Sequence, residues 1–455
     1  MKETKGIITT EEMELCKHCI AVARQCGASA MRVSLSKCIQ NSISILDGEV
    51  DNISYSIDRS IFVHVFASGR YGTFSTNRLE RSQLEDFVKK AVETTVVLAA
   101  DECRSLPSPE RKAKSCTSGD ELGLVDAQYF DVEQERKVHL ALEFAECRLE
   151  ASDSYSIDSI ESEYSDSYDD NYMVDSDGFE GRHTESNFGF CSEVTIQDTE
   201  GNRYSGYQWM STPFFADFDA SQITTRAVMD AAAQIGPRDI KSGKYTVVVH
   251  TKTASRLVGP IIHALDGNSI QQKFSFLADS LGKRIFPENL TVYDKATEPG
   301  RMGSRLFDTE GVATADGPII ENGVVKKFFV NTYCSAKTGM EPTVEGPSRP
   351  LVEPFICNSD KKEITLNDIL EHCGSGILVT GFNGGNCNQA TGNFSFGIEG
   401  FVFENGRIVH PVQEALMTGN IIELWNSIMA AGSDARRCTR WQIPSLAFGN
   451  ADISA

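Results

Sequence analysis

The chain has 455 residues, enough for two or three domains that each bury a core of their own. Its 64 acidic and 43 basic side chains leave a net charge of −21, which argues against direct binding to a nucleic-acid backbone. The longest apolar runs are too short to cross a bilayer, and the first residues lack the apolar stretch of a signal peptide. We therefore expect no membrane association and a cytoplasmic location.

The cysteines are numerous but scattered. There are thirteen, an odd number, and most lie within apolar or helical stretches. Without a secretory signal, this pattern favours reduced, buried thiols over a disulfide framework. Cys16 and Cys19 have C-x-x-C spacing, but no second ligand pair accompanies them. We interpret them as structural thiols rather than as a zinc or redox site.

Two helices are predicted in the first hundred residues. The first covers residues 9–26, because Thr9 and Glu12 form a capping box and a glycine follows the last residue. The second begins at Ser82, where Glu85 completes a second capping box ahead of an apolar face. Alternating strands are expected between them, with turns at Asp47-Gly48 and Gly69-Arg70. These strands cover residues 31–35, 42–46, 50–56, 61–66 and 71–75.

The middle of the chain combines a linker, a helix and an acidic segment. Residues 101–128 contain proline, glycine and many charges, and we interpret them as a linker between domains. A helix is predicted over residues 131–151. Residues 153–177 have the acidic, serine-rich composition of disorder, yet tyrosine and isoleucine recur throughout. Paired, solvent-facing strands around the Asp177-Gly178 turn explain this better, with an acidic docking surface as the alternative.

The C-terminal half is predicted to be rich in strands. A buried strand is expected at residues 244–250, and hairpin turns at three Asn-Gly pairs, which are Asn322-Gly323, Asn383-Gly384 and Asn405-Gly406. Helices are expected over residues 221–235, 253–265, 365–373 and 420–430. The fold class is therefore α+β, with an N-terminal antiparallel sheet flanked by helices, followed by a β-rich C-terminal domain with a few helices. We place the domains at residues 1–105, 106–220 and 221–455.

Several stretches resemble one known family, in order and over most of the chain. They are Val258–Asn268, Asp47–Asn52 with Val65–Gly72, Asn171–Gly181, Phe307–Val312 with Ile320–Lys326, and Gly381–Ser395 followed by Pro411-Val412 and Gly419-Asn420. The family is TldD/PmbA, peptidase-like proteins known as modulators of DNA gyrase. The run Ser275–Lys283 and the motif described next are similar to its PmbA (TldE) branch.

The family's zinc motif is degenerate in this chain. On the pattern H-E-A-x-G-H, His263 takes the place of the first His, Ala264 that of the Glu and Asn268 that of the second His. An alanine cannot move a proton, and an amide is a poor zinc ligand. The resemblance therefore implies a degenerate metallopeptidase domain with no catalytic residue and no cofactor of its own. Zinc is expected in a TldD-like partner.

Two further sets of site residues are candidates. His263 and Cys438 are weak metal candidates, since the active branch supplies a cysteine near this place. The alternative is a packed histidine and an unrelated thiol. The glycine-rich run from Gly381 lacks the lysine of a phosphate-binding loop, but its glycines allow a backbone to approach closely. By resemblance the peptide-facing candidates are Asn383, Gly384, Gly385, Asn388, Thr391 and Gly392. A tight structural turn is the alternative.

Two classes of function follow from the resemblance. In the first, the chain is a non-catalytic PmbA/TldE-like subunit that forms a heterodimer with a TldD-like catalytic subunit and acts on small or unfolded peptides. In the second, it is a stand-alone homodimeric peptide- or protein-binding protein of the gyrase-modulator type. Ala264 and Asn268 argue against an autonomous peptidase. We also expect an apolar subunit interface of more than about 1,000 Å² on the C-terminal half.

Overall fold

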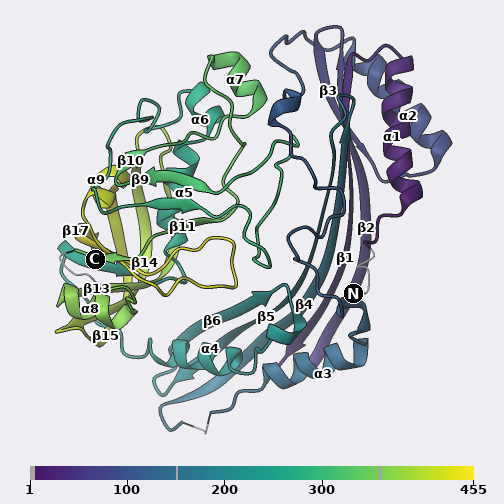
Figure 1. Ribbon diagram of the computed structural model, residues 1–455. Helices are drawn as coiled ribbons and strands as arrows, with labels where there is room; N and C mark the ends of the chain where they lie inside the picture. The colour runs from purple at the N-terminus through teal and green to yellow at the C-terminus, as the bar shows by residue number, and fades with distance from the viewer. Residues whose placement is uncertain (1–5, 150–151, 358–360) are drawn as a thin grey trace.

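The computed structural model describes residues 6–149, 152–357 and 361–455. A long curled sheet faces a β-rich C-terminal part, and the predicted α+β class is confirmed (Figure 1). The curled sheet is antiparallel with the strand order β3-β2-β1-β4-β5-β6. Its strands are β1 (Ala30–Leu46), β2 (Glu49–Ala67), β3 (Arg70–Thr76), β4 (Tyr155–Asp175), β5 (Glu180–Asp198) and β6 (Arg203–Thr212).

The first two predicted hairpins are present, but their strands are longer than expected. The turn at Asp47-Gly48 has positive φ at both residues, as a two-residue hairpin turn requires, and the next turn lies one residue earlier than predicted. Residues 31–35 and 42–46 belong to one strand, β1. The polar stretch between them stays in the sheet because Lys37 pairs with Glu12, while Asn41 donates to Asp166.

Helices pack on one face of this sheet, and three of them come from the first 150 residues. These three are α1 (Thr10–Gln25), α2 (Arg81–Thr95) and α3 (Gln134–Ala145), so the third is shorter than predicted. The capping box of Thr9 and Glu12 on α1 is confirmed. The one predicted for α2 is wrong, because the helix begins at Arg81 and the side chain of its N-cap residue, Glu80, accepts no capping hydrogen bond from a backbone amide. Glu85 instead contacts His18 on α1, with 2.8 Å between Oε1 and Nε2.

The acidic segment forms β4, which pairs with β5 around the predicted turn. The strands are confirmed, but their solvent-facing character is wrong. The side chains of Tyr164, Tyr168 and Tyr172 are fully buried. Three carboxylates are buried as well, and each has a cation. Asp166 pairs with Lys137 at 2.9 Å, Asp170 with Arg182 at 2.6 Å and Asp175 with Lys112 at 2.6 Å. The acidic residues of this segment therefore include buried carboxylates that pair with cations, in addition to carboxylates on the surface.

The predicted linker packs tightly between the two parts of the molecule. The Ala113 amide donates to the Gly311 carbonyl at 3.0 Å, and the Arg182 amide donates to the Cys116 carbonyl at 2.7 Å. The Arg104 guanidinium lies 4.8 Å from the centre of one aromatic ring, that of Tyr71 in the curled sheet. It lies 3.5 Å from a second ring, that of Tyr333 in the C-terminal part.

The C-terminal strands form two sheets. Strand β17 pairs with β7 as well as with β15 and β16, so that β7, β13, β14, β15 and β17 close on one another. The larger sheet contains β7 (Gly243–Val249), β12 (Phe355–Ile356), β13 (Gly376–Cys387), β14 (Asn393–Glu404), β15 (Arg407–Asn420), β16 (Ile428–Ala431) and β17 (Leu446–Ser454). The smaller sheet contains β8 (Val292–Asp294), β9 (Gly317–Glu321), β10 (Val324–Val325) and β11 (Pro350–Val352).

Each of the four helices predicted for the C-terminal half is present, and two short helices, α6 (Gly267–Gln271) and α7 (Thr332–Thr338), were not predicted. The predicted four are α4 (Ile223–Ala232), α5 (Ser255–Ala264), α8 (Leu366–Cys373) and α9 (Ile421–Asn426). The helix predicted over residues 420–430 is too long. Its apolar end forms β16, which pairs with β12 and β17. Across the described residues no helix is both long and apolar enough to cross a membrane.

Candidate functional site

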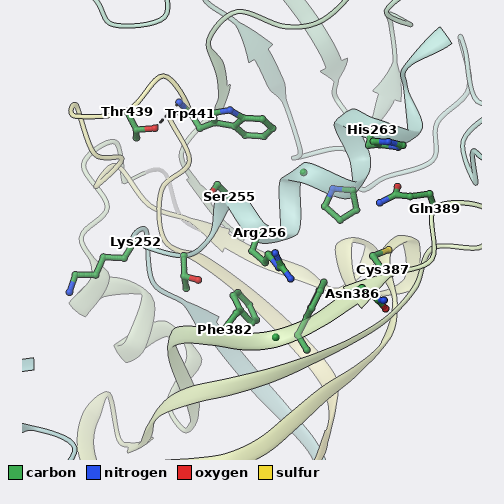
Figure 2. A pocket seen from close by; sticks show the side chains of 15 residues that line it. Lys252, Ser255, Arg256, His263, Phe382, Asn386, Cys387, Gln389, Thr439 and Trp441 are labelled. Atoms are coloured by element: carbon green, nitrogen blue, oxygen red, sulfur yellow. Dashed lines mark hydrogen bonds between the residues drawn. The ribbon is translucent and has the colours of Figure 1, made fainter. Parts of the chain in front are cut away.

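A cavity of about 880 Å³ lies beside α5, and Figure 2 shows the side chains around it. Helix α5 forms one wall, the β13–β14 hairpin a second, and a loop near the C-terminus a third. The lining includes Lys252, Ser255, Arg256, His263, Phe382, Asn386, Cys387, Gln389, Thr439 and Trp441. Segments up to about 190 positions apart along the chain therefore meet at one site.

Helix α5 has two distinct faces. Arg256, Gly259 and His263 recur at helical spacing and line the cavity. Leu257, Ile261 and Ala264 point the other way, and none of the three exposes more than 1% of its surface. Ala264 therefore belongs to the apolar core rather than to the cavity.

The motif from His263 to Asn268 spans a break between two helices, and the helix predicted over residues 253–265 ends close to where it was expected to end. Helix α5 ends at Ala264, and α6 begins after Asp266, whose carboxylate accepts hydrogen bonds from the amides of Asn268 and Ser269. Gly267 donates its amide to the Phe329 carbonyl at 2.7 Å, and this close approach separates the two helices. The two motif positions consequently lie on different helices.

The side chains of His263 and Asn268 each form a hydrogen bond with a nearby residue. The Nδ1 atom of His263 and the hydroxyl of Ser269 share a hydrogen bond of 3.2 Å. The thiol of Cys334 on α7 donates to the amide oxygen of Asn268 at 3.1 Å. Burial raises the pKa of Cys334 to about 11, so the thiol is protonated near neutral pH and suits the role of donor.

The glycine-rich run contributes to the cavity through a small part of its length. Gly384 lines the cavity together with Asn386, Cys387 and Gln389. Gly385 packs against the chain's own backbone, since a Cβ there would lie 2.0 Å from the Ser395 carbonyl oxygen. The predicted turn at Asn383-Gly384 is wrong, because these residues lie at a bulge within β13.

The remaining candidates of this run hold the hairpin together. Asn388 accepts hydrogen bonds from the amides of Ala390 and Thr391, as an Asx turn does. The carbonyl of Thr391 accepts from Asn420 at 2.8 Å, and Gly392 follows with positive φ. Asn383 bonds to Glu399 on the neighbouring strand β14. A peptide-facing role for these residues stays a prediction.

Family models match three consecutive parts of the chain. The PmbA/TldA metallopeptidase domain 1 matches residues 32–95, the central domain matches residues 128–235, and the C-terminal domain matches residues 242–455. The chain belongs to the PmbA/TldA metallopeptidase family. This is the TldD/PmbA family that the sequence resembles, and the prediction is confirmed.

Individual relatives extend over nearly the whole chain. The crystal structure of a candidate modulator of DNA gyrase from Bacteroides thetaiotaomicron is 36% identical, with a TM-score of 0.93, over 99% of this chain and 100% of that one. The metalloprotease PmbA homolog of Haemophilus influenzae is 25% identical over 100% of this chain and 99% of its own length. TldE from Thermococcus kodakarensis shares the fold at 17% identity and a TM-score of 0.82, over 97% of this chain and 100% of its own.

The residues at the PmbA/TldA motif do not fit a catalytic zinc ion. Such a site needs three protein ligands around the metal. Of the motif positions, His263 keeps a ligating group, whereas the Asn268 amide is bonded to Cys334. The cavity adds Cys387, but Cys438 is not among its lining residues. Across residues 6–149, 152–357 and 361–455, no group of three His, Cys, Asp or Glu side chains is arranged to hold a metal.

Sequence reasoning missed the residues that give the cavity its character. The Arg256 guanidinium donates to the Gly385 carbonyl at 2.9 Å and lies 5.1 Å from the ring centre of Phe396. Trp441 and Gln389 reach the same cavity from distant loops. No local motif marks these residues, because the closed arrangement of β7, β13, β14, β15 and β17 brings them together. Cys334 was missed for the same reason, since it lies 66 positions beyond Asn268.

Proposed function

We propose that this chain is the non-catalytic, peptide-holding subunit of a TldD/TldE-type metallopeptidase. In this proposal a homologous subunit carries the zinc ion and hydrolyses small or unfolded peptides. The observation that carries the proposal is the position of Ala264, which replaces the catalytic Glu and lies in the apolar core. A helix adapted to packing at this point supports loss of the general base rather than its relocation.

The chemistry of the cavity supports a peptide as the ligand. Asn386 and Gln389 carry amides that can both donate to and accept from a peptide backbone. The Oε1 atom of Gln389 is buried and has no hydrogen-bond partner within the described part of the chain. Phe382 and Trp441 supply apolar surface for side chains. Ligand sites typically have an apolar wall with a few polar groups that orient the ligand.

Charge indicates which part of a peptide the cavity would hold. The whole chain has a net charge of −21, yet Lys252 and Arg256 line the cavity and none of its lining residues is Asp or Glu. Lys252 pairs with Asp230 outside the lining, which leaves Arg256 as the cation available to a ligand. A local cation in an acidic protein favours an anionic group on the ligand. We therefore propose that the cavity holds the C-terminal carboxylate or an acidic side chain of the peptide.

The test is reconstitution with a homologue that carries the intact H-E-A-x-G-H motif. Cleavage of an unstructured fluorogenic peptide is measured for that homologue alone, with this chain, and with its Arg256→Glu variant. We expect this chain to raise kcat/KM, and the variant to lose most of the gain, by about tenfold, because the exposed Arg256 guanidinium would no longer attract the anionic group of the peptide. Arg407→Glu, which changes an exposed arginine on β15, is the matched control and should behave as the native chain. Equal cleavage with and without this chain would contradict the proposal.

A further inference from the structure

A second pocket, of about 300 Å³, shares a loop with the cavity beside α5. We call it the Arg349 pocket, and its lining comes from residues 295–301, 349–354 and 432–442. The last of these segments also contributes Thr439 to the cavity. Among the described residues the two sites have no lining residue in common, so the Arg349 pocket is a separate site.

The lining of this pocket is strongly basic. Lys295, Arg301, Arg349 and Arg437 contribute four cations, and Glu298 is the carboxylate among the described lining residues. The pocket therefore has an excess of three positive charges, in a chain whose net charge is −21. Such an excess attracts small anions, because a concave site with low-dielectric walls focuses the potential.

Two of these cations have no carboxylate partner. Glu298 pairs with Arg349 at 2.6 Å and with Arg301 at 3.5 Å. Neither Lys295 nor Arg437 forms an ion pair within the part of the chain that the structure describes. The side chain of Arg437 is also exposed to solvent. Both cations are therefore available to a ligand.

Arg349 is buried and held in place, yet one of its donors is unused. The residue is 4% exposed. Its amide donates to the Asp294 carboxylate at 2.7 Å, and its Nη1 atom donates to Glu298 at 2.6 Å. Its Nε atom has no hydrogen-bond partner within the described residues. A buried donor of this kind destabilises the fold unless water or a ligand accepts from it.

The chemistry of the pocket favours phosphate over other small anions. A guanidinium presents parallel N–H donors that match two phosphate oxygens, and a phosphate monoester carries a charge of about −1.5 to −2 near neutral pH. A carboxylate would neutralise one of the three excess charges. Leu351, Val352 and Pro354 add an apolar wall, which suits the organic part of an ester.

We propose that the Arg349 pocket binds a phosphate group, either on a small phosphate monoester or as free phosphate. Lys295 and Arg437 supply the unpaired cations, and Arg349 supplies the buried guanidinium. The apolar wall favours the monoester. The proposal does not rest on the peptide-holding function, because the cavity beside α5 is lined by other residues.

The test is isothermal titration calorimetry of the purified full chain at pH 7.5 and low salt. We expect inorganic phosphate to bind with a dissociation constant on the order of 100 µM. Phenyl phosphate that binds about threefold more tightly or better would identify a monoester as the ligand, and equal affinity would identify free phosphate. Acetate should bind at least about tenfold more weakly than phosphate, and equal binding of acetate would overturn the proposal.

Variants assign the binding to this pocket. Arg437→Glu should weaken phosphate binding by about tenfold or more, and Lys295→Ala by about fivefold, because each removes an unpaired cation. Arg407→Glu, at an exposed position on β15, is the matched control and should leave the affinity unchanged. Arg256→Ala, in the cavity, should leave it unchanged as well.

Two results would overturn the proposal. One is the absence of saturable phosphate binding up to about 10 mM, a concentration well above the expected dissociation constant. The other is full affinity in Arg437→Glu together with lost affinity in Arg256→Ala, which would place the anion in the cavity beside α5. Neither result bears on the reconstitution assay, so failure of this proposal is distinguishable from failure of the proposed function.

Discussion

Ala264 occupies the position of the glutamate in the H-E-A-x-G-H motif, and its side chain packs in the core. The side chain is fully buried among apolar groups, and its backbone carbonyl accepts a hydrogen bond from Ser275. A carboxylate at this position would face the core rather than the cavity that His263 lines. The helix around it is therefore adapted to packing, and the neighbouring break at Asp266 separates it from Asn268.

Restoring the glutamate should accordingly damage the fold. We expect Ala264→Glu to lower the free energy of unfolding by about 3 kcal/mol or more, because a carboxyl group would be buried without a partner. Ser255→Glu places the same group on the cavity side of the same helix and should change it by less than about 1 kcal/mol. Urea unfolding measures both. Equal free energies of unfolding for the two variants would contradict the packing of residue 264 in the apolar core.

His64 couples the stability of the curled sheet to pH. Burial, followed by the positive charges of Arg32 and Arg104, lowers its pKa from 6.5 to about 4. Its Nδ1 atom shares a hydrogen bond of 2.7 Å with the hydroxyl of Tyr71. As the pH falls below 6.5, the unfolded chain takes up this proton before the folded chain does. The free energy of unfolding should therefore fall between pH 6.5 and about 4.

The contribution of this histidine is measurable as a difference between two chains. Across that window the native protein should lose up to about 3 kcal/mol more than His64→Gln, whose side chain does not titrate. Urea unfolding at several pH values gives both curves. Parallel curves for the two proteins would contradict the lowered pKa.

At the scale of elements, local signals were predictable and distant partners were not. The capping box of Thr9 and Glu12 and the Asp47-Gly48 turn involve neighbours in sequence, and both were predicted correctly. The continuity of β1 was missed because Asn41 finds its partner, Asp166, 125 positions away. The cavity was missed for the same reason, although His263 on its wall was a candidate from the start.

Two glycines at the bulge in β13, Gly384 and Gly385, differ in the space that a side chain would have. Gly385 and Gly384 both have positive φ, but a Cβ at Gly385 would meet the Ser395 carbonyl, while one at Gly384 has nothing within 4 Å. Gly385→Ala should cost about 3 kcal/mol or more, because the β14 backbone must move. Gly384→Ala should cost about 1 kcal/mol for its backbone conformation alone. Thermal or urea unfolding compares them, and similar costs would mean that the bulge relaxes freely.

At the scale of the whole molecule, two features depend on strand pairing between distant parts of the sequence. The cavity beside α5 is lined by Arg256 and by Lys252, which pairs with Asp230, and within the described residues β2 has no strand on its outer side over positions 49–60. The apolar interface expected on the C-terminal half stays a prediction. Composition indicated an acidic protein of several domains, but neither feature follows from composition, since both depend on how strands distant in sequence pair.

The loss of catalysis is the central claim, and the zinc content of the purified chain tests it most directly. We expect less than about 0.1 zinc ion per chain after dialysis against a trace of zinc, because the motif supplies one ligand where three are needed. The same preparation should not cleave unstructured peptides. One zinc ion per chain, together with peptide cleavage that a chelator abolishes and added zinc restores, would contradict the account.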